Sequence, residues 1–186
     1  MVARAESADE TRRRVLAAAV DEVWRHRVPD VRLQDVAAKA DVTTQTVLRI
    51  FGSRSQLLDA ALESMRDRIM EQRGSASPGD IPATVTALFD HYEDMGDFVI
   101  RNLAEEHAHP ELSEWLERGR TAHRQSMERQ FGPRLAGRAD RALLVDCLVV
   151  ACDVYAWKLL RRDLRKSRED AEACVRRSVS AILECA

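Results

Sequence analysis

The stretch Leu33–Gly52, LQDVAAKADVTTQTVLRIFG, decides the fold of the first part of the chain. Apolar residues recur in its first half at intervals of three and four, which predicts a short helix with one apolar side. Asp41 and Val42 then interrupt the pattern. The hydroxyl of Thr43 can accept a hydrogen bond from the first turn of a second helix, Thr44–Phe51. We therefore predict two short helices joined by a tight turn.

The second helix has two different faces. Val47, Ile50 and Phe51 stand at positions i, i+3 and i+4, so we expect this face to be buried. The residues expected on the opposite, outward face are Thr44, Gln45, Leu48 and Arg49. Such a face offers hydrogen-bond donors and acceptors that could enter the major groove of DNA. On this stretch alone, an ordinary helical hairpin is the alternative.

The turn departs from the usual pattern of DNA-reading motifs at Asp41, where glycine is most common. Aspartate tolerates the left-handed backbone conformation better than most residues, so we expect the turn to form at some cost in free energy. Gly52 follows the second helix as a typical helix end, and Ser53 with Gln56 can cap the helix after it.

Composition and patterning predict an all-α protein. Arg, Ala, Glu, Asp and Leu dominate the 186 residues, and the alternating apolar runs typical of strands are absent. The formal net charge of −2 gives no sign of nucleic-acid binding. Residues 1–58 carry a balance of +2 and residues 59–186 a balance of −4, a difference too small to decide the question.

The sequence predicts a soluble, cytoplasmic protein without a membrane span. Residues 1–8 lack the apolar run of a signal peptide, and the most apolar stretch, Ala142–Leu160, is interrupted by charged side chains. The four cysteines form no CxxC pair and are predicted to be small core residues in a reducing compartment; they are Cys147, Cys152, Cys174 and Cys185.

Outside the two short helices, the pattern predicts helices throughout. The first is expected to be capped at Ser7 or Thr11, with Trp24 on its buried side, and a long helix is expected over Arg54–Arg73 with Ile69 buried. The linker is Gly74–Asp80, GSASPGD. Residues 81–186 predict four or five further helices, among them 85–92, a short one at 98–106 that ends near Pro110, 112–131, a long apolar one at 139–164, and a last one capped by Ser167.

The stretch Thr11–Met65 combines a helix, the two short helices, and the segment FGSRSQLL at Phe51–Leu58. In order and spacing this resembles the N-terminal domain of the TetR family (AcrR-like helix-turn-helix repressors), with its signature F-G-S-[KR]-x-x-L-L. The resemblance implies a DNA-binding domain at residues 1–58, with the helix-turn-helix motif at 33–52. It also implies a ligand-binding and dimerisation domain at residues 59–186.

The resemblance also implies which residues contact DNA. The predicted contacts are Arg32, Thr43, Thr44, Gln45, Leu48, Arg49 and Arg54. The three arginines are expected to contact phosphates, and Thr44, Gln45 and Leu48 to read bases. Arg32 replaces the family's usual threonine, Leu48 its usual aromatic residue, and Arg54 its usual lysine, so the operator sequence cannot be inferred. Three further arginines, 12–14, are expected either to touch phosphates or to form a solvated face.

A helix that is apolar on nearly all sides needs two partners, so one side of Ala142–Leu160 can meet a second subunit. Purely intramolecular burial is the alternative. The resemblance implies a homodimer in which the last two helices of each protomer form a four-helix interface, and a pocket for a small apolar or amphipathic ligand. The predicted lining residues are Phe89, Tyr92, Phe98, Trp115, His123 and Tyr155, although aromatic residues of this kind are more often core.

No catalytic constellation or glycine-rich phosphate loop is present, and His107 and His109 are poorly spaced for a metal site, so we predict neither an enzyme nor a bound cofactor or metal. The prediction is a homodimeric DNA-binding repressor that a small ligand releases from a palindromic operator. The alternative is a dimeric helical interaction module without ligand response.

Overall fold

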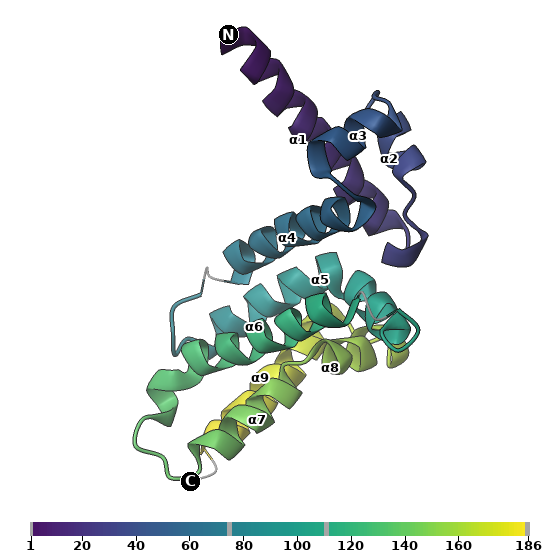
Figure 1. Ribbon diagram of the computed structural model, residues 1–186. Coiled ribbons are helices and arrows are strands. Elements are labelled where there is room, and N and C mark those ends of the chain that lie inside the picture. The colour runs from purple at the N-terminus through teal and green to yellow at the C-terminus, as the bar shows by residue number, and fades with distance from the viewer. Residues whose placement is uncertain (1, 74–75, 110–111, 185–186) are drawn as a thin grey trace. The chain divides into compact units, whose positions relative to one another are not determined.

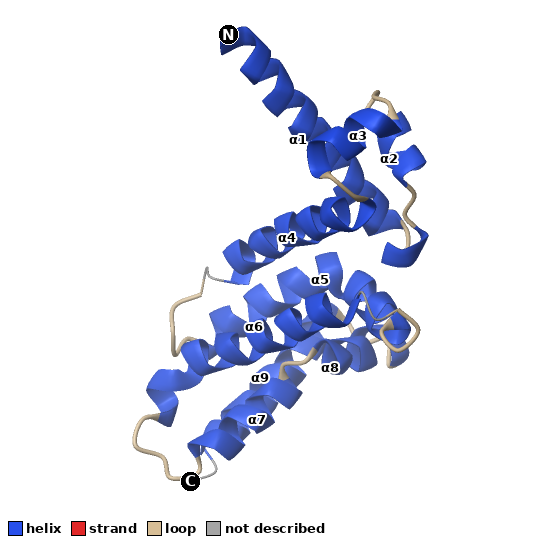
Figure 2. Cartoon of the chain, viewed as in Figure 1, coloured by secondary structure: helices blue, strands red, loops and turns tan. Residues whose placement is uncertain are grey.

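The computed structural model describes residues 2–73, 76–109 and 112–184. Within these ranges the chain is all-helical and contains no strand, which confirms the predicted fold class (Figure 2). None of the described helices combines the length and the apolar character of a membrane-crossing segment. The chain divides into two compact units, Met1–Arg68 and Ile69–Ala186, so the first unit extends further than the predicted domain at 1–58. Pro110 and Cys185 lie outside the described residues, as do the side chain of Ile69 and the first two residues of the predicted linker.

The first unit is built from short and long helices in the order predicted (Figure 1). Its elements are α1 (Val2–Arg25), the 3₁₀ turn η1 (Val28–Asp30), α2 (Leu33–Lys39), α3 (Thr44–Phe51) and the beginning of α4 (Arg54–Arg73). Because α1 starts at Val2, neither Ser7 nor Thr11 begins this helix, and that prediction was wrong.

Branched and small apolar side chains fill the core of the first unit. They come from all four helices: Val15, Ala19 and Val23; Val36 and Ala37; Val47 and Phe51; Leu57, Leu58 and Ala61. Trp24 does not join them, since it is 38% exposed near the end of α1. The prediction of a buried Trp24 was therefore wrong, because helical spacing does not show how far the core extends along α1.

The second unit contains the remaining helices, which Figure 1 shows in teal, green and yellow. Its elements are α5 (Ile81–Glu105), α6 (Ser113–Phe131), η3 (Gly132–Leu135), α7 (Arg141–Ala151), α8 (Val154–Lys158), the π-helical turn η4 (Leu159–Asp163) and α9 (Arg168–Glu184). Its core joins side chains from α5, α6, α7, α8 and α9; the largest include Phe89, Met127, Phe131, Leu148 and Trp157.

The helix α5 is continuous, so the separate helix predicted at 98–106 was wrong. Asp80 caps its start by accepting a hydrogen bond from the N–H of Ala83 at 2.9 Å. Gly96, in the middle of α5, serves packing rather than a turn, because a Cβ atom there would lie within 3.0 Å of the indole ring of Trp157. The indole ring therefore occupies the space that a side chain at this position would need.

The long helix predicted at 139–164 is broken between α7 and α8, which corrects that prediction. The carboxylate of Asp153 accepts a hydrogen bond from the N–H of Tyr155 at 2.8 Å and so starts α8 as an N-cap. The hydroxyl of Tyr92 donates to the carbonyl of Cys152 at 3.0 Å, and Nε2 of His123 lies 3.1 Å from the carbonyl of Val149. Side chains of α5 and α6 therefore bond to carbonyl oxygens around the break.

Ion pairs attach the π-helical turn η4 to α5. Arg161 donates to Glu93 at 2.6 Å, and this hydrogen bond holds the pKa of Glu93 below its usual range. Arg162 pairs with Asp97 at 3.0 Å, and its guanidinium lies 4.4 Å from the ring centroid of Trp157. The position of η4 along α5 is therefore set by charged groups as well as by the indole ring.

The cysteines are only partly core residues. Cys152 is buried, Cys147 is half-buried and Cys174 is exposed on α9, and none of these three forms a disulfide. The prediction of a core position was therefore wrong for Cys174.

We expect Gly96→Ala to lower the free energy of unfolding by about 1–3 kcal/mol, because the added methyl group must displace the indole ring of Trp157. Gly119→Ala on α6 is the matched control, since no atom lies within 4 Å of the position of its Cβ. This control should be neutral or stabilise the helix by up to about 1 kcal/mol. Urea denaturation followed by circular dichroism measures both variants, and equal effects would contradict the packing role of Gly96.

Candidate functional site

The turn between α2 and α3 has the geometry expected from the sequence. Asp41 adopts a left-handed conformation with φ of 52°, as predicted for an aspartate at a position where glycine is usual. The N–H of Val42 donates to the carbonyl of Ala37 at 3.0 Å, which closes the end of α2. The chain can therefore leave α2 and enter α3 within four residues, Ala40–Thr43.

Both ends of α3 are fixed by local interactions. The hydroxyl of Thr43 accepts a hydrogen bond from the N–H of Thr46 at 3.1 Å, which confirms the predicted N-cap. Gly52 ends the helix with φ of 85°, a conformation that glycine adopts without steric cost. Ser53 then caps α4 by accepting from the N–H of Gln56 at 3.1 Å. These caps set the length and the direction of α3.

The helix α3 is attached to its unit by one face. Val47 and Phe51 are buried, whereas Gln45 and Arg49 are exposed and Leu48 is 39% exposed. Thr44 and Ile50 lie at the boundary and are half-buried, so Ile50 is less enclosed than predicted. A ridge of amide, aliphatic and guanidinium groups therefore faces away from the core.

Arg12 on α1 joins the C-terminal end of α3, a role that the sequence did not reveal. Its Nη1 donates to the carbonyl of Ile50 at 3.2 Å, and its guanidinium lies 4.5 Å from the ring centroid of Phe51. A cation at this position interacts favourably with the last carbonyls of the helix and with the aromatic ring. Arg13 forms an ion pair with Glu10 at 2.8 Å, and Arg14 is exposed. The three arginines predicted as one group thus differ in their surroundings.

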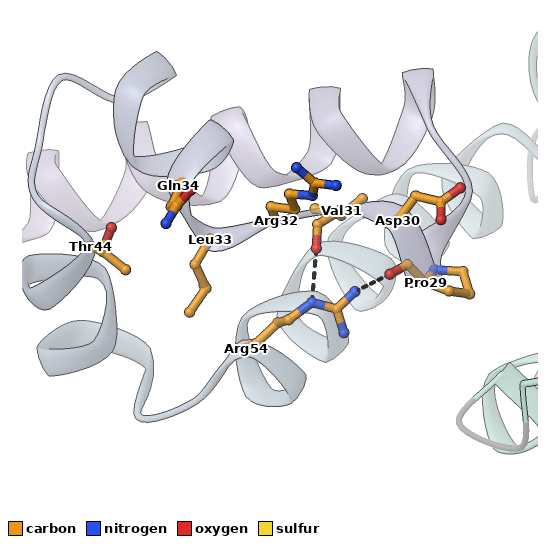
Figure 3. A pocket seen from close by; sticks show the side chains of 8 residues that line it. All are labelled: Pro29, Asp30, Val31, Arg32, Leu33, Gln34, Thr44 and Arg54. Atoms are coloured by element: carbon orange, nitrogen blue, oxygen red, sulfur yellow. Dashed lines mark hydrogen bonds between the residues drawn. The ribbon is translucent and has the colours of Figure 1, made fainter.

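A hollow of about 660 Å³ lies beside the starts of α2, α3 and α4 (Figure 3). Its lining residues are Pro29, Asp30, Val31, Arg32, Leu33, Gln34, Thr44 and Arg54. Three of the predicted DNA contacts, Arg32, Thr44 and Arg54, come together here although they are separated by up to 22 positions in the sequence. Gln45, Leu48 and Arg49 lie instead on the exposed ridge of α3.

Arg54 is bonded to the loop before α2. Its Nε donates to the carbonyl of Val31 at 2.8 Å, and its Nη2 donates to the carbonyls of Val28 and Pro29, both at 2.9 Å. Figure 3 shows the guanidinium directed toward the carbonyls of Val31 and Pro29. The sequence pattern predicts Arg54 at the start of a helix, but it does not indicate which carbonyl groups its side chain will reach.

The residues predicted to line a ligand pocket occupy different environments. Phe89, Tyr92 and Phe98 are buried, and the ring of Phe98 packs edge-on against Trp115 at a centroid distance of 5.6 Å. Tyr92 bonds to the carbonyl of Cys152, and His123 to the carbonyl of Val149 in α7. Tyr155 is 55% exposed, so it lies on the surface rather than inside, and its predicted position was wrong.

The second unit also exposes large apolar side chains. We call this set the apolar strip: Leu143 and Val150 on α7, Tyr155 on α8, Leu159 on η4, and Leu164 directly after η4. Leu143 and Val150 are separated by two helical turns and so share a face of α7, and they are 63% and 71% exposed. Exposed apolar side chains that share a face, as Leu143 and Val150 do, are candidates for an interaction surface.

Within the described ranges, no three His, Cys, Asp or Glu side chains gather as metal ligands would. Neither a scan against protein-family models nor a search of curated proteins found a match for this chain.

We expect Thr43→Ala to lower the free energy of unfolding by about 1 kcal/mol, because an orphan N–H of α3 loses its acceptor. Thr43→Ser keeps the hydroxyl and is the control, with an expected change of a few tenths of a kcal/mol. Thermal and urea denaturation measure the difference between the two variants. An alanine variant as stable as the serine variant would show that the cap does not hold α3.

Proposed function

We propose that this chain is a TetR-like transcriptional regulator that binds double-stranded DNA through a helix-turn-helix formed by α2 and α3. The observation that carries the proposal is the one-sided attachment of α3, which buries Val47 and Phe51 and leaves Gln45 and Arg49 exposed. A helix that enters a major groove must be held by one face while the other presents side chains to base edges. In this proposal the first unit is the DNA-binding domain, and the helices of the second form a bundle for dimerisation and ligand binding.

Individual side chains take different roles at the DNA. Arg32 is exposed at the start of α2 and Arg49 on the ridge of α3, where both can reach phosphates. Gln45 can pair with adenine through its amide, and Leu48 can contact a thymine methyl group. Thr44, half-buried at the first turn of α3, can donate to a base or a phosphate through its hydroxyl. Thr43 uses its hydroxyl as the N-cap and sets the direction in which these groups point.

A second copy of the chain completes the proposed regulator. One α3 reads half an operator, and a two-fold dimer reads a palindrome whose half-sites lie about 34 Å apart or somewhat more. The predicted pair of last helices corresponds to α7–η4 and α9, and the first of these carries the apolar strip. Because these side chains are exposed in a single chain, burial against a second copy is favourable.

Release from the operator by a small ligand is the part of the proposal that rests on the resemblance to the TetR family. In one conformation of the dimer, the two α3 helices cannot span both half-sites. A ligand that binds this conformation more tightly than the DNA-bound one would cause release. A repressor of this kind acts in the cytoplasm, where it has access to the chromosome. The apolar strip also favours a second candidate function, a dimeric helical interaction module without a DNA or ligand response.

Fluorescence anisotropy with the chain's own upstream intergenic DNA, at several salt concentrations, separates the two functions. A DNA-binding regulator should lose affinity steeply as salt increases and should prefer this DNA to a random duplex. Gln45→Ala should change the preference among sequences by about 1–3 kcal/mol at the contacted base, whereas Arg49→Gln should weaken binding to all sequences alike. An equal loss on every sequence for Gln45→Ala would rule out base reading by this residue.

The dimer can be tested separately. Val150→Glu and Leu159→Glu place charges within the apolar strip, so we expect both to shift the protein from dimer to monomer in analytical ultracentrifugation. Leu48→Glu is the matched control, since Leu48 is an exposed leucine on α3, outside the strip. This control should remain dimeric while losing DNA binding through charge repulsion with the phosphates. Dimers that persist in both strip variants would place the interface elsewhere.

A further inference from the structure

The loop between α1 and α2 determines where α2 begins. It contains the single 3₁₀ turn Val28–Asp30, and the side chains of Val28 and Val31 are buried on its inner side. Arg32 follows directly, in an extended conformation with φ of −105°, and its carbonyl accepts the N–H of Val36 at 3.3 Å. The direction of the exposed Arg32 side chain and the start of α2 thus depend on how this loop is held.

Arg54 holds the loop from the start of α4. Three hydrogen bonds of 2.8–2.9 Å connect its guanidinium to the carbonyls of Val28, Pro29 and Val31. These bonds come from Nε and Nη2, so Nη1 is the one guanidinium nitrogen that does not take part in them. A hydrogen bond from a charged donor is worth more than one between neutral groups, and three of them converge here on one short loop.

We propose that Arg54 is a positioning residue that fixes the loop and thereby aims Arg32 at a DNA phosphate, rather than being a phosphate clamp itself. This inference rests on the proposed DNA-binding function and refines it. A direct clamp by Nε and Nη2 would require Arg54 to break the bonds that fix the loop. Without these donors, the segment before Arg32 would keep its buried valine side chains, the Arg27–Asp30 ion pair and the hydrogen bonds within its own turn, but it would lose its bonds to α4.

A positioning role explains why residue 54 is arginine. The three carbonyls lie around two edges of a planar guanidinium, which presents its donors in a fixed fork. A lysine carries one compact ammonium group and cannot reproduce that fork, although it has the same charge. A phosphate clamp accepts either residue, since both carry a positive charge that a phosphate oxygen can meet. The exchange of arginine for lysine therefore distinguishes positioning from clamping.

The test compares Arg32→Gln, Arg54→Gln, Arg54→Lys and the double variant Arg32→Gln/Arg54→Gln in the full chain. Affinity for upstream duplex DNA is measured by anisotropy across a salt series, together with helical content and melting temperature by circular dichroism. We expect each single variant to lose about tenfold in affinity, the size of one charged hydrogen bond. Each should also lower the slope of log affinity against log salt by about 0.9, the contribution of one phosphate.

The double variant should lose no more affinity or slope than Arg32→Gln, because Arg54 acts through Arg32. Three results would overturn the inference: wild-type affinity in Arg54→Lys, a further slope loss of about 0.9 in the double variant, or a lower melting temperature with unchanged DNA binding. If Arg54→Gln loses its helical circular dichroism signal, the DNA affinity and salt slope of Arg54→Lys alone are compared with those of wild type and Arg32→Gln.

The same measurements separate this inference from the proposed function. Wild-type protein that shows no salt-dependent binding to upstream or random duplex contradicts the function itself. Wild-type protein that binds, combined with any of the three results above, contradicts only the positioning role of Arg54.

Discussion

The arrangement of the first unit depends on the burial of one face of a helix of eight residues. Val47 and Phe51 lie one turn apart on α3, and their enclosure fixes how the helix is rotated about its axis. Burying an apolar side chain of this size stabilises a fold by about 1.5–3 kcal/mol, far more than a single exposed polar contact. Gln45 and Arg49 are therefore exposed because of where the apolar residues lie, not because of any interaction of their own. The proposed recognition surface follows from this constraint.

Both units use polar side chains to hold irregular backbone through its carbonyl oxygens. Arg54 bonds to the loop before α2, Arg12 to the end of α3, and Tyr92 to the carbonyl of Cys152 at the break between α7 and α8. Carbonyl groups at helix ends and in loops have no partner within regular structure, so they need donors from elsewhere. Each donor comes from a different element than its acceptor. The places where helices start, stop or bend are thus fixed by side chains that are distant in sequence.

The segment α8–η4 of the second unit has one side attached to α5 and another that is exposed. The segment α8–η4 is attached to α5 on one side, through Trp157, Arg161 and Arg162, and exposes Tyr155 and Leu159 on another. Ion pairs and an indole ring therefore connect α5 with the segment that carries Tyr155 and Leu159. In the proposed regulator, this would connect the interior of the second unit physically with the surface proposed for dimerisation.

What the sequence determined by itself is local. The N-caps Thr43 and Ser53, the left-handed Asp41 and the helix end at Gly52 were all predictable, since each depends on bonds or dihedral angles within four residues. The helical class and the buried face of α3 followed from periodicity in the same way. Tertiary structure decided the rest. The fit of Trp157 against Gly96, the carbonyl partners of Arg54, Arg12 and Tyr92, and the exposure of Tyr155 each depend on residues from another element. Periodicity shows that a side chain lies on one face of its helix, but only the packed chain shows what that face meets.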